Sequence, residues 1–235
     1  MTEDLTGRVV AVAVGDGELA TVIVERFKAA GARVRRVIPP TAGCATDDLQ
    51  EFRQVVNRLV RTEGRLDVWI QEAHSERTGD VLGLDQPTWE GGLSASVGFA
   101  IAGAQVAGTT MLAQGGGTIV FLTSVDGLLA SAGRAVACCG AAAVVMLAKV
   151  LACEWAASGV RVNAVASTAW LAPPQGLEAV ELTAAGISPT RIPLGRPPRL
   201  DEVAEAVFYL GSPKSSFVTG ETLRLDGGWV GYQLF

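Results

Sequence analysis

The chain has 235 residues, 49% of them hydrophobic and 18% charged, a length that fits one large domain or two small ones. A net charge of -5 argues against a nucleic-acid partner, and no apolar run reaches the roughly 20 residues that span a bilayer. Zinc is disfavoured, because the four cysteines lack C-x-x-C spacing and the chain has one histidine. The acidic start, residues 1–4, is unlike a signal peptide, so we expect a cytoplasmic protein with reduced thiols and no membrane or nucleic-acid partner.

The first half of the chain alternates predicted strands and helices. Residues 8–14 form an apolar, β-branched run with no polar alternation past its first residue, which is typical of a strand buried on both faces. A turn at residues 15–17 leads into a helix in which Leu19, Ile23 and Phe27 stack one turn apart. The further expected elements of this half are a strand at 34–38, a helix at 46–64, a strand at 66–70 and a long helix of small residues at 87–112.

The second half continues this alternation. The expected elements are strands at 118–123, 160–165 and 221–225, and helices at 134–157 and 200–210. Residues 168–198 are rich in Pro and Gly and predict a lid or an insertion. Strands that alternate with helices predict an α/β fold with a doubly wound parallel sheet flanked by helices. Since the sequence has no linker or repeat, we expect a single domain over residues 1–235.

Several motifs follow one another in the second half of the chain. They are GTIV at 117–120 followed by Ser124, GVRVNAV at 159–165, GRP at 195–197, FVTGE at 217–221 and LDGG at 225–228. Together these motifs resemble the short-chain dehydrogenase/reductases, whose fold is of the Rossmann type. The resemblance covers nearly the whole chain, and it implies a Rossmann-type sheet and a nicotinamide dinucleotide as the cofactor of the active relatives.

The glycine loop of the resembling family differs here. The family pattern is T-G-x-x-x-G-x-G, whose glycines let the backbone approach a pyrophosphate at a helix N-terminus. Laid on residues 13–20, the three glycine positions become Val14, Glu18 and Ala20. A Cβ at Val14 and a carboxylate at Glu18 oppose a diphosphate, the charges by roughly several kcal/mol at an effective dielectric near 20. Two other glycines remain in the turn, so a shifted loop through them is the rival interpretation.

The adenosine side of the implied cofactor site also departs from the family. Relatives end the second strand with an acidic residue that holds the ribose, and the matching position here is Ile38. Arg35 and Arg36 precede it and suggest a 2′-phosphate, although we favour an edge strand protected by charge. Residues 39–46 are too few for the helix and edge strand that relatives carry next. We therefore expect one edge helix–strand unit to be deleted.

The resemblance also locates the catalytic set of the family, a Ser, a Tyr, a Lys four residues later and an Asn on a neighbouring helix. These fall on Ser124, Ala137, Ala141 and Ser96, in that order. Only Ser124 is retained, and loss of the tyrosine acid removes a factor of roughly 10² to 10⁴ in rate. The family motifs N-N-A-G and P-G, at residues 71–74 and 167–168, are lost as well. We therefore expect no catalytic set, no bound cofactor and no metal.

The remaining polar residues leave another type of site open. In a strand, Glu72 and His74 face the same side, and together with Ser124 they suggest a hydrolytic or cyclising site. Cys138 and Cys139 are more typical of small packing residues than of nucleophiles.

The helix expected at 134–157 is apolar on nearly all sides, so it needs covering on every side. In the resembling family this helix and the preceding one form a four-helix bundle across a dimer axis. We therefore expect a catalytically inactive subunit, a pseudoenzyme, that assembles with an active relative or with itself. The expected assembly is a heterotetrameric NAD(P)-dependent dehydrogenase of hydroxyacyl type, with a CoA thioester as a family-level substrate. The alternatives are a cyclase, hydrolase or lyase that reuses the vacated cleft, a ligand-binding or regulatory pseudoenzyme and, last, an active dehydrogenase with relocated residues.

Overall fold

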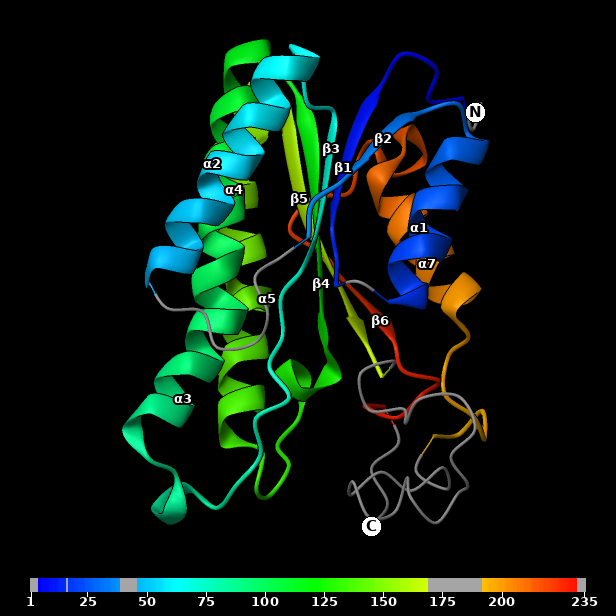
Figure 1. Ribbon diagram of the computed structural model, residues 1–235. Helices are drawn as coiled ribbons and strands as arrows, with labels where there is room; N and C mark the ends of the chain where they lie inside the picture. The colour runs from blue at the N-terminus through cyan, green and yellow to red at the C-terminus, as the bar shows by residue number, and fades with distance from the viewer. Residues whose placement is uncertain (1–3, 16, 39–45, 169–191, 232–235) are drawn as a thin grey trace.

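The computed structural model describes residues 4–15, 17–38, 46–168 and 192–231 and shows helices on both faces of a parallel sheet (Figure 1). Within these residues the sheet has six strands in the order β2-β1-β3-β4-β5-β6. The strands are β1 (Val9–Ala13), β2 (Arg33–Arg36), β3 (Val68–Glu72), β4 (Gly117–Ser124), β5 (Val160–Ser167) and β6 (Thr222–Leu225). The predicted doubly wound α/β fold is confirmed.

The helices form two layers (Figure 1). Helices α1 and α7 cover one face of the sheet, and α2, α4 and α5 cover the other. Their bounds are α1 (Glu18–Ala29), α2 (Thr46–Glu63), α3 (Gln86–Leu93), α4 (Phe99–Gln114), α5 (Ala135–Trp155) and α7 (Leu200–Gly211).

Strand β1 shows why the sequence lacks polar alternation. Its side chains alternate between the two layers, with Val9 and Ala11 in the core beneath α2 and α4, and Val10 and Val12 in the core beneath α1 and α7. Both faces of a parallel strand flanked by helices are buried, so apolar residues occur at every position.

Strand β2 lies at the edge of the sheet and pairs with β1. Arg33, Arg35 and Arg36 are exposed along it, as expected for an edge strand protected by charge. Within the described residues no strand lies beyond β2, and α2 begins at Thr46. Most of the stretch predicted to have lost a helix–strand unit, residues 39–45, lies outside the described residues.

The long helix predicted at 87–112 is divided by a π-helical turn over Ser94–Gly98, which joins α3 to α4. Asp85 caps α3 by accepting a hydrogen bond of 2.9 Å from the Thr88 N–H. By length and composition alone, the helical stretches Gln86–Gln114 and Ala135–Ser158 would suffice to cross a membrane, but half of each apolar window is buried in the fold. Core helices that pack on a sheet meet the same criterion, so this is weak evidence for a membrane.

The strand order creates a switch point at β1. The chain leaves β1 for β2 on one side and returns to β3 on the other, so the connections diverge above the carboxyl ends of β1 and β3. Open α/β sheets bind ligands in the crevice at such a point. The carboxyl ends face the lower side of Figure 1. Most of the predicted lid, residues 169–191, lies outside the described residues.

Candidate functional site

A buried serine stands at the carboxyl end of β4. The Ser124 hydroxyl donates a hydrogen bond of 2.9 Å to Asp126 Oδ2 and accepts one of 3.1 Å from the Asp126 N–H. Arg134 holds the same carboxylate in a bidentate contact, from Nε to Oδ1 at 3.1 Å and from Nη2 to Oδ2 at 2.7 Å. The hydrogen bond to Asp126 raises the pKa of Arg134. This fork therefore fixes the carboxylate that orients Ser124.

The single histidine lies on the neighbouring segment. Its Nδ1 is 3.3 Å from Glu72 Oε1, and its Nε2 is 3.8 Å from Glu76 Oε1. The hydrogen bond with His74 lowers the pKa of Glu76, against the effect of burial, and the positive charge of Arg134 adds to this lowering. Since Glu72 pairs with Leu122 in the parallel register, His74 and Ser124 occupy equivalent positions two residues farther along.

These contacts connect five side chains, which we call the carboxyl-end cluster: His74, Glu76, Ser124, Asp126 and Arg134. Two of these residues, His74 and Ser124, were predicted from the sequence. The other three were not, because a charge contact between a turn residue and a helix start eight positions away leaves no periodic signal. The cluster offers a hydroxyl to orient an oxygen atom and an imidazole to exchange a proton.

The positions matched to the family tyrosine and lysine lie inside the fold. Ala137 is 1% exposed and Ala141 is fully buried. Ser96, at the family asparagine position, is buried in the π turn and donates to the Gly92 carbonyl at 2.9 Å. Tyr209 lies half exposed on α7, outside the carboxyl-end cluster.

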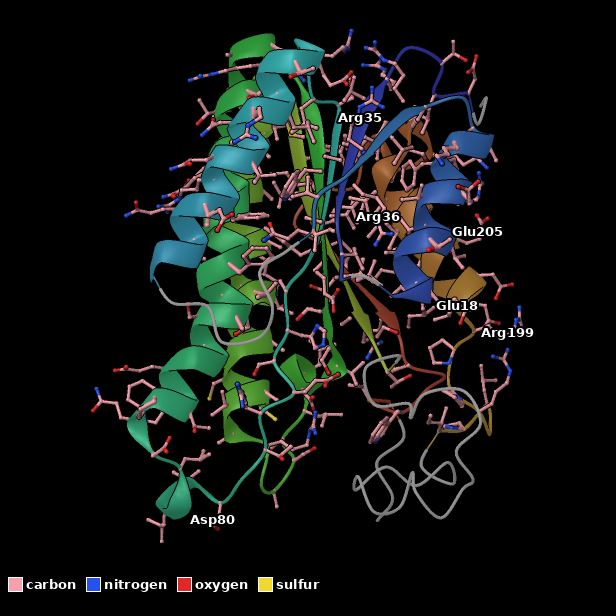
Figure 2. All side chains as sticks on the ribbon, viewed as in Figure 1. Glu18, Arg35, Arg36, Asp80, Arg199 and Glu205 are labelled. Carbon is pink, nitrogen blue, oxygen red and sulfur yellow. The ribbon has the colours of Figure 1, made fainter. Side chains whose placement is uncertain are left out.

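The loop before α1 has a different structure from the one its sequence implied. Val14 and Ala20 are buried in the core beneath α1, so neither side chain lines the outside of the loop. Glu18 is exposed at the first position of α1 (Figure 2). Gly17 caps the helix without any side-chain hydrogen bond, which leaves a backbone site of the kind that binds phosphate.

A carboxylate of the protein approaches this loop. Glu72 Oε2 accepts a hydrogen bond of 2.7 Å from the Gly15 N–H. On the other side, Arg36 donates to the Gly15 carbonyl at 3.3 Å, and Arg35 pairs with Glu63 at 2.7 Å (Figure 2). One carboxylate therefore binds the N–H of Gly15, and one guanidinium binds its carbonyl group.

A fold of this type implies a nicotinamide dinucleotide as the cofactor, and the residues around Gly15 show whether its phosphates would fit. The Gly15 N–H and the first N–H groups of α1, with Arg36 beside them, fit a phosphate group once the Glu72 carboxylate turns away. At the end of β5, the Thr168 hydroxyl is buried and has no hydrogen-bond partner among the described residues, which fits a polar group of a ligand. The residues therefore fit the cofactor only when the Glu72 carboxylate has left the Gly15 N–H, because a phosphate would bind the same N–H group.

The cysteines and the acidic residues are weaker candidates for a catalytic or metal-binding site. Burial raises the pKa of Cys138, so its thiol is a poor nucleophile at neutral pH. Cys138, Cys139 and Cys153 are free thiols. In the part of the chain that the structure describes, no three His, Cys, Asp or Glu residues gather as a metal site.

The sequence matches one family model over almost its full length. The model describes the family as "Enoyl-(Acyl carrier protein) reductase" and covers residues 7–230.

Curated relatives with similar sequences include reductases and dehydrogenases. The 3-oxoacyl-[acyl-carrier-protein] reductase FabG of Thermotoga maritima is 31% identical over 183 residues, or 78% of this chain and 74% of that protein. An uncharacterised oxidoreductase of Mycobacterium tuberculosis is 33% identical over 198 residues, or 80% of this chain and 72% of that protein.

Solved structures share the fold at low sequence identity. A gluconate 5-dehydrogenase from Burkholderia cenocepacia, solved with NADP and tartrate, superposes with a TM-score of 0.81 at 20% identity over 98% of both chains. A short-chain type dehydrogenase/reductase from Mycobacterium marinum gives 0.81 at 23% identity over 97% of both chains.

The expectation of a catalytically inactive subunit in a heteromeric dehydrogenase is wrong. The matching proteins are named as reductases, dehydrogenases and oxidoreductases in their own right, and nothing among them indicates inactivity or a heteromeric partner. The same finding opposes the non-redox and ligand-binding alternatives. One physical reason why this expectation failed lies in the loop before α1. Val14 and Ala20 face the core there and do not fill the cleft.

Proposed function

Because the chain belongs to the family of short-chain dehydrogenase/reductases, we propose that it is an oxidoreductase that interconverts an alcohol and a carbonyl group. The observation that carries this proposal is the buried Ser124 hydroxyl at the carboxyl end of β4, fixed by Asp126 and Arg134 beside the switch point.

The serine positions the reacting oxygen. When a substrate binds, the Ser124 O–H turns from Asp126 to the substrate oxygen and donates a hydrogen bond to it, which leaves the alcohol O–H free to face His74. The Asp126 N–H donates to the Ser124 oxygen, and Arg134 keeps Asp126 in place, so the serine oxygen holds its position. Holding the alcohol in one orientation lowers the entropic part of the barrier.

His74 is the proposed general base and general acid. As the alcohol becomes a carbonyl, its O–H bond breaks and His74 accepts the proton, and in the reverse direction His74 returns it. Glu72 and Glu76 lie on either side of the ring, with Glu72 Oε1 3.3 Å from Nδ1 and Glu76 Oε1 3.8 Å from Nε2, and they hold its orientation. The Gly15 N–H, the start of α1 and Arg36 would hold the phosphates of a nicotinamide dinucleotide, which would supply or accept the hydride. In this proposal the chain departs from the family set at Ala137 and Ala141 and uses His74 in place of the tyrosine.

The names of relatives define the substrates to test. They include a 3-oxoacyl-[acyl-carrier-protein] reductase, a D-threitol dehydrogenase and a gluconate 5-dehydrogenase. The panel therefore contains 3-oxoacyl thioesters, polyols and sugar acids, each with NAD(H) and NADP(H).

The experiment compares purified wild type with Ser124→Ala and His74→Gln by nucleotide absorbance. Ser124→Ala should lower kcat/KM by about 10² to 10³, and His74→Gln by about 10² to 10⁴. Ser158→Ala, an exposed serine near the opposite end of the sheet, is the matched control and should retain wild-type activity. Absence of turnover in the wild type with the whole panel, or equal activity in Ser124→Ala and Ser158→Ala, would contradict the proposal.

We also propose that the chain pairs with a second copy of itself in the cytoplasm. Half of each apolar window in the α3–α4 and α5 helices is not buried, and Ile101, Met146 and Val150 are exposed there. Exposed apolar patches of this kind commonly mark interfaces, and two-fold pairing of equivalent surfaces is their commonest solution.

A further inference from the structure

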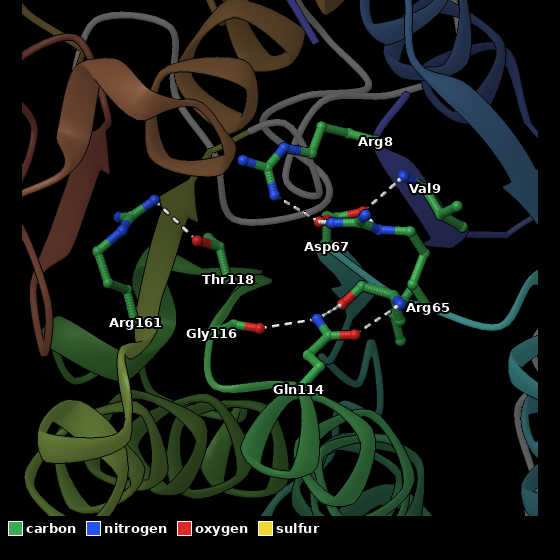
Figure 3. Close-up of polar contacts among 9 residues, drawn as sticks. Arg8, Val9, Arg65, Asp67, Gln114, Gly116, Thr118 and Arg161 are labelled. Carbon is green, nitrogen blue, oxygen red and sulfur yellow. Dashed lines mark hydrogen bonds and ion pairs between the residues drawn. The ribbon is translucent and has the colours of Figure 1, made fainter. Parts of the chain in front are cut away.

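A large cavity lies at the end of the sheet opposite the carboxyl-end cluster. It has a volume of 1070 Å³ and opens at the amino ends of β1, β3, β4 and β5. Figure 3 shows the polar groups that surround it, with Arg161 and Thr118 on one side and Arg8, Asp67 and Arg65 on the other. Small-molecule sites have volumes of about 300–1,000 Å³, so the space is ample for a ligand.

Arg161 brings an uncompensated positive charge into the cavity wall. Its guanidinium donates to two hydroxyl groups, of Thr118 at 2.8 Å and of Ser215 at 3.0 Å. Its other acceptors are backbone carbonyls, those of Leu210, Ser212 and Val218. None of these five acceptors is a carboxylate, and burial lowers the pKa of the guanidinium. An arginine stays charged under such conditions. Because these acceptors use the Nη hydrogens of Arg161, it attracts an anion through its charge and leaves the direct hydrogen bonds to Arg8.

The opposite side of the cavity adds a second excess charge. Arg8 and Arg65 share the single carboxylate of Asp67, with Arg8 Nη1 at 2.7 Å from Oδ1 and Arg65 Nη2 at 2.6 Å from the same atom. Asp67 also accepts from the Val9 N–H at 2.8 Å, so its oxygens are fully used. Two guanidiniums against one carboxylate leave one net positive charge beside the opening. The Arg8 side chain is 54% exposed and lines the cavity, so it is able to reach a ligand.

The lining of the cavity also has an exposed aromatic residue, Phe217, at 103% exposure. A cavity lined by an exposed aromatic ring and by guanidinium groups suits a ligand that has both a flat apolar part and a negative group.

We propose that this cavity binds a small aromatic anion, with its charged group between Arg8 and Arg161 and its ring against Phe217. Phosphate and carboxylate groups share the required chemistry, because both match the guanidinium fork. The site is separate from the proposed oxidoreductase cleft, since it lies at the opposite ends of the same strands.

The test is calorimetric titration of the whole protein with phenyl phosphate, benzoate, inorganic phosphate and benzyl alcohol. We expect the two aromatic anions to bind more tightly than inorganic phosphate or benzyl alcohol, and the ratio of the two aromatic anions identifies the preferred group. Arg8→Gln should weaken phenyl phosphate binding by about tenfold, the loss of one charge-assisted contact. Phe217→Ser should weaken it severalfold, and Arg58→Gln, an exposed arginine of α2 outside the cavity, should leave it unchanged.

Thermal melts of each variant separate loss of binding from loss of folding. Failure of both phenyl phosphate and benzoate to bind the folded wild type would overturn the proposal. So would an equal effect of Arg8→Gln and Arg58→Gln, which would indicate general charge attraction. Dissociation of an oligomer in Phe217→Ser, without any change in phenyl phosphate binding, would show that a second copy covers the ring and would also overturn it.

Discussion

Glu72 Oε2 lies 2.7 Å from the backbone nitrogen of Gly15, although the two residues are 57 positions apart in the chain. The carboxylate therefore sits where the backbone would otherwise meet a phosphate. A negative group at this place repels an incoming diphosphate and holds the N–H that would bind it.

Glu72→Gln should tighten the binding of NADP and NAD by about tenfold, or about 1.4 kcal/mol, because the amide keeps the shape and loses the charge. Titration calorimetry measures the two dissociation constants. Glu51→Gln, an exposed carboxylate of α2, is the control for a change in net charge. Equal affinities in wild type and Glu72→Gln would show that this carboxylate does not compete with the cofactor.

Arg134→Gln should destabilise the fold as well as slow the reaction. Asp126 is 2% exposed, and loss of the guanidinium leaves a buried carboxylate without its partner. Breaking a buried pair of this kind typically costs about 3–5 kcal/mol. Urea unfolding measures the loss, and Arg199→Gln, whose contact with Asp201 is exposed, should cost less than about 1 kcal/mol. A small loss of stability in Arg134→Gln would mean that water takes over the two hydrogen bonds that Arg134 donates to Asp126.

Asp67→Asn should remove part of the acid sensitivity of the protein. Burial alone would raise the pKa of Asp67, but hydrogen bonds from Arg65, the Val9 N–H and Arg8 outweigh it and lower the pKa. A lowered pKa in the folded state stabilises the protein above the ordinary pKa of aspartate, near 3.9, and this contribution is lost as the pH falls through the folded-state pKa. Urea unfolding from pH 6 to pH 2 should therefore show a smaller decline for the variant than for the wild type. Parallel curves would refute the assignment.

Gly127→Ala should destabilise the protein by roughly 1–3 kcal/mol through overpacking. A Cβ built on Gly127 would lie 2.6 Å from the Ala141 carbonyl carbon and 2.7 Å from the Ala142 nitrogen, and backbone atoms cannot move aside as a flexible side chain does. Gly83→Ala is the matched control, since a Cβ there meets nothing within 4 Å. Thermal unfolding of the two variants gives the comparison, and equal melting temperatures would show that α5 shifts to accommodate the methyl group.

Met146→Glu should convert the expected oligomer into monomers. Met146 is 56% exposed on the outer face of α5, so a charge there is tolerated in a monomer and is buried at close packing in a pair. Light scattering after size-exclusion chromatography measures the mass. Lys214→Glu, remote from this face, keeps the assembly intact. A wild type that is monomeric at all concentrations would contradict the self-association proposal.

The elements that the sequence predicted well are those with a local pattern. Strand β1 and helix α1 follow directly from an unbroken apolar run and a 3.6-residue period, because both depend on neighbours in the chain. The π turn at Ser94–Gly98 was missed, since one extra residue per turn changes hydrogen bonds and leaves the composition unchanged.

The site was predicted less completely than the fold. Ser124 and His74 were identified, but the fork between Arg134 and Asp126 and the contact between Glu72 and Gly15 depend on tertiary structure. For Val14, by contrast, the sequence predicted an effect that the structure does not show. Its substitution for a glycine suggested an obstruction in the cleft, whereas the backbone turns its side chain into the core, where it is 2% exposed.

The strand order also determines how slowly the chain can acquire its structure. Val10 pairs with Val68, Val68 with Thr118, and Ala164 with Thr222, so each of these neighbouring strand pairs joins residues 50 to 58 positions apart. No hairpin can nucleate a sheet of parallel strands, and distant pairing delays folding. A chain emerging from the ribosome therefore exposes the unpaired edge of β4 until β5 is complete, and synthesis at lower temperature should improve the yield of folded protein.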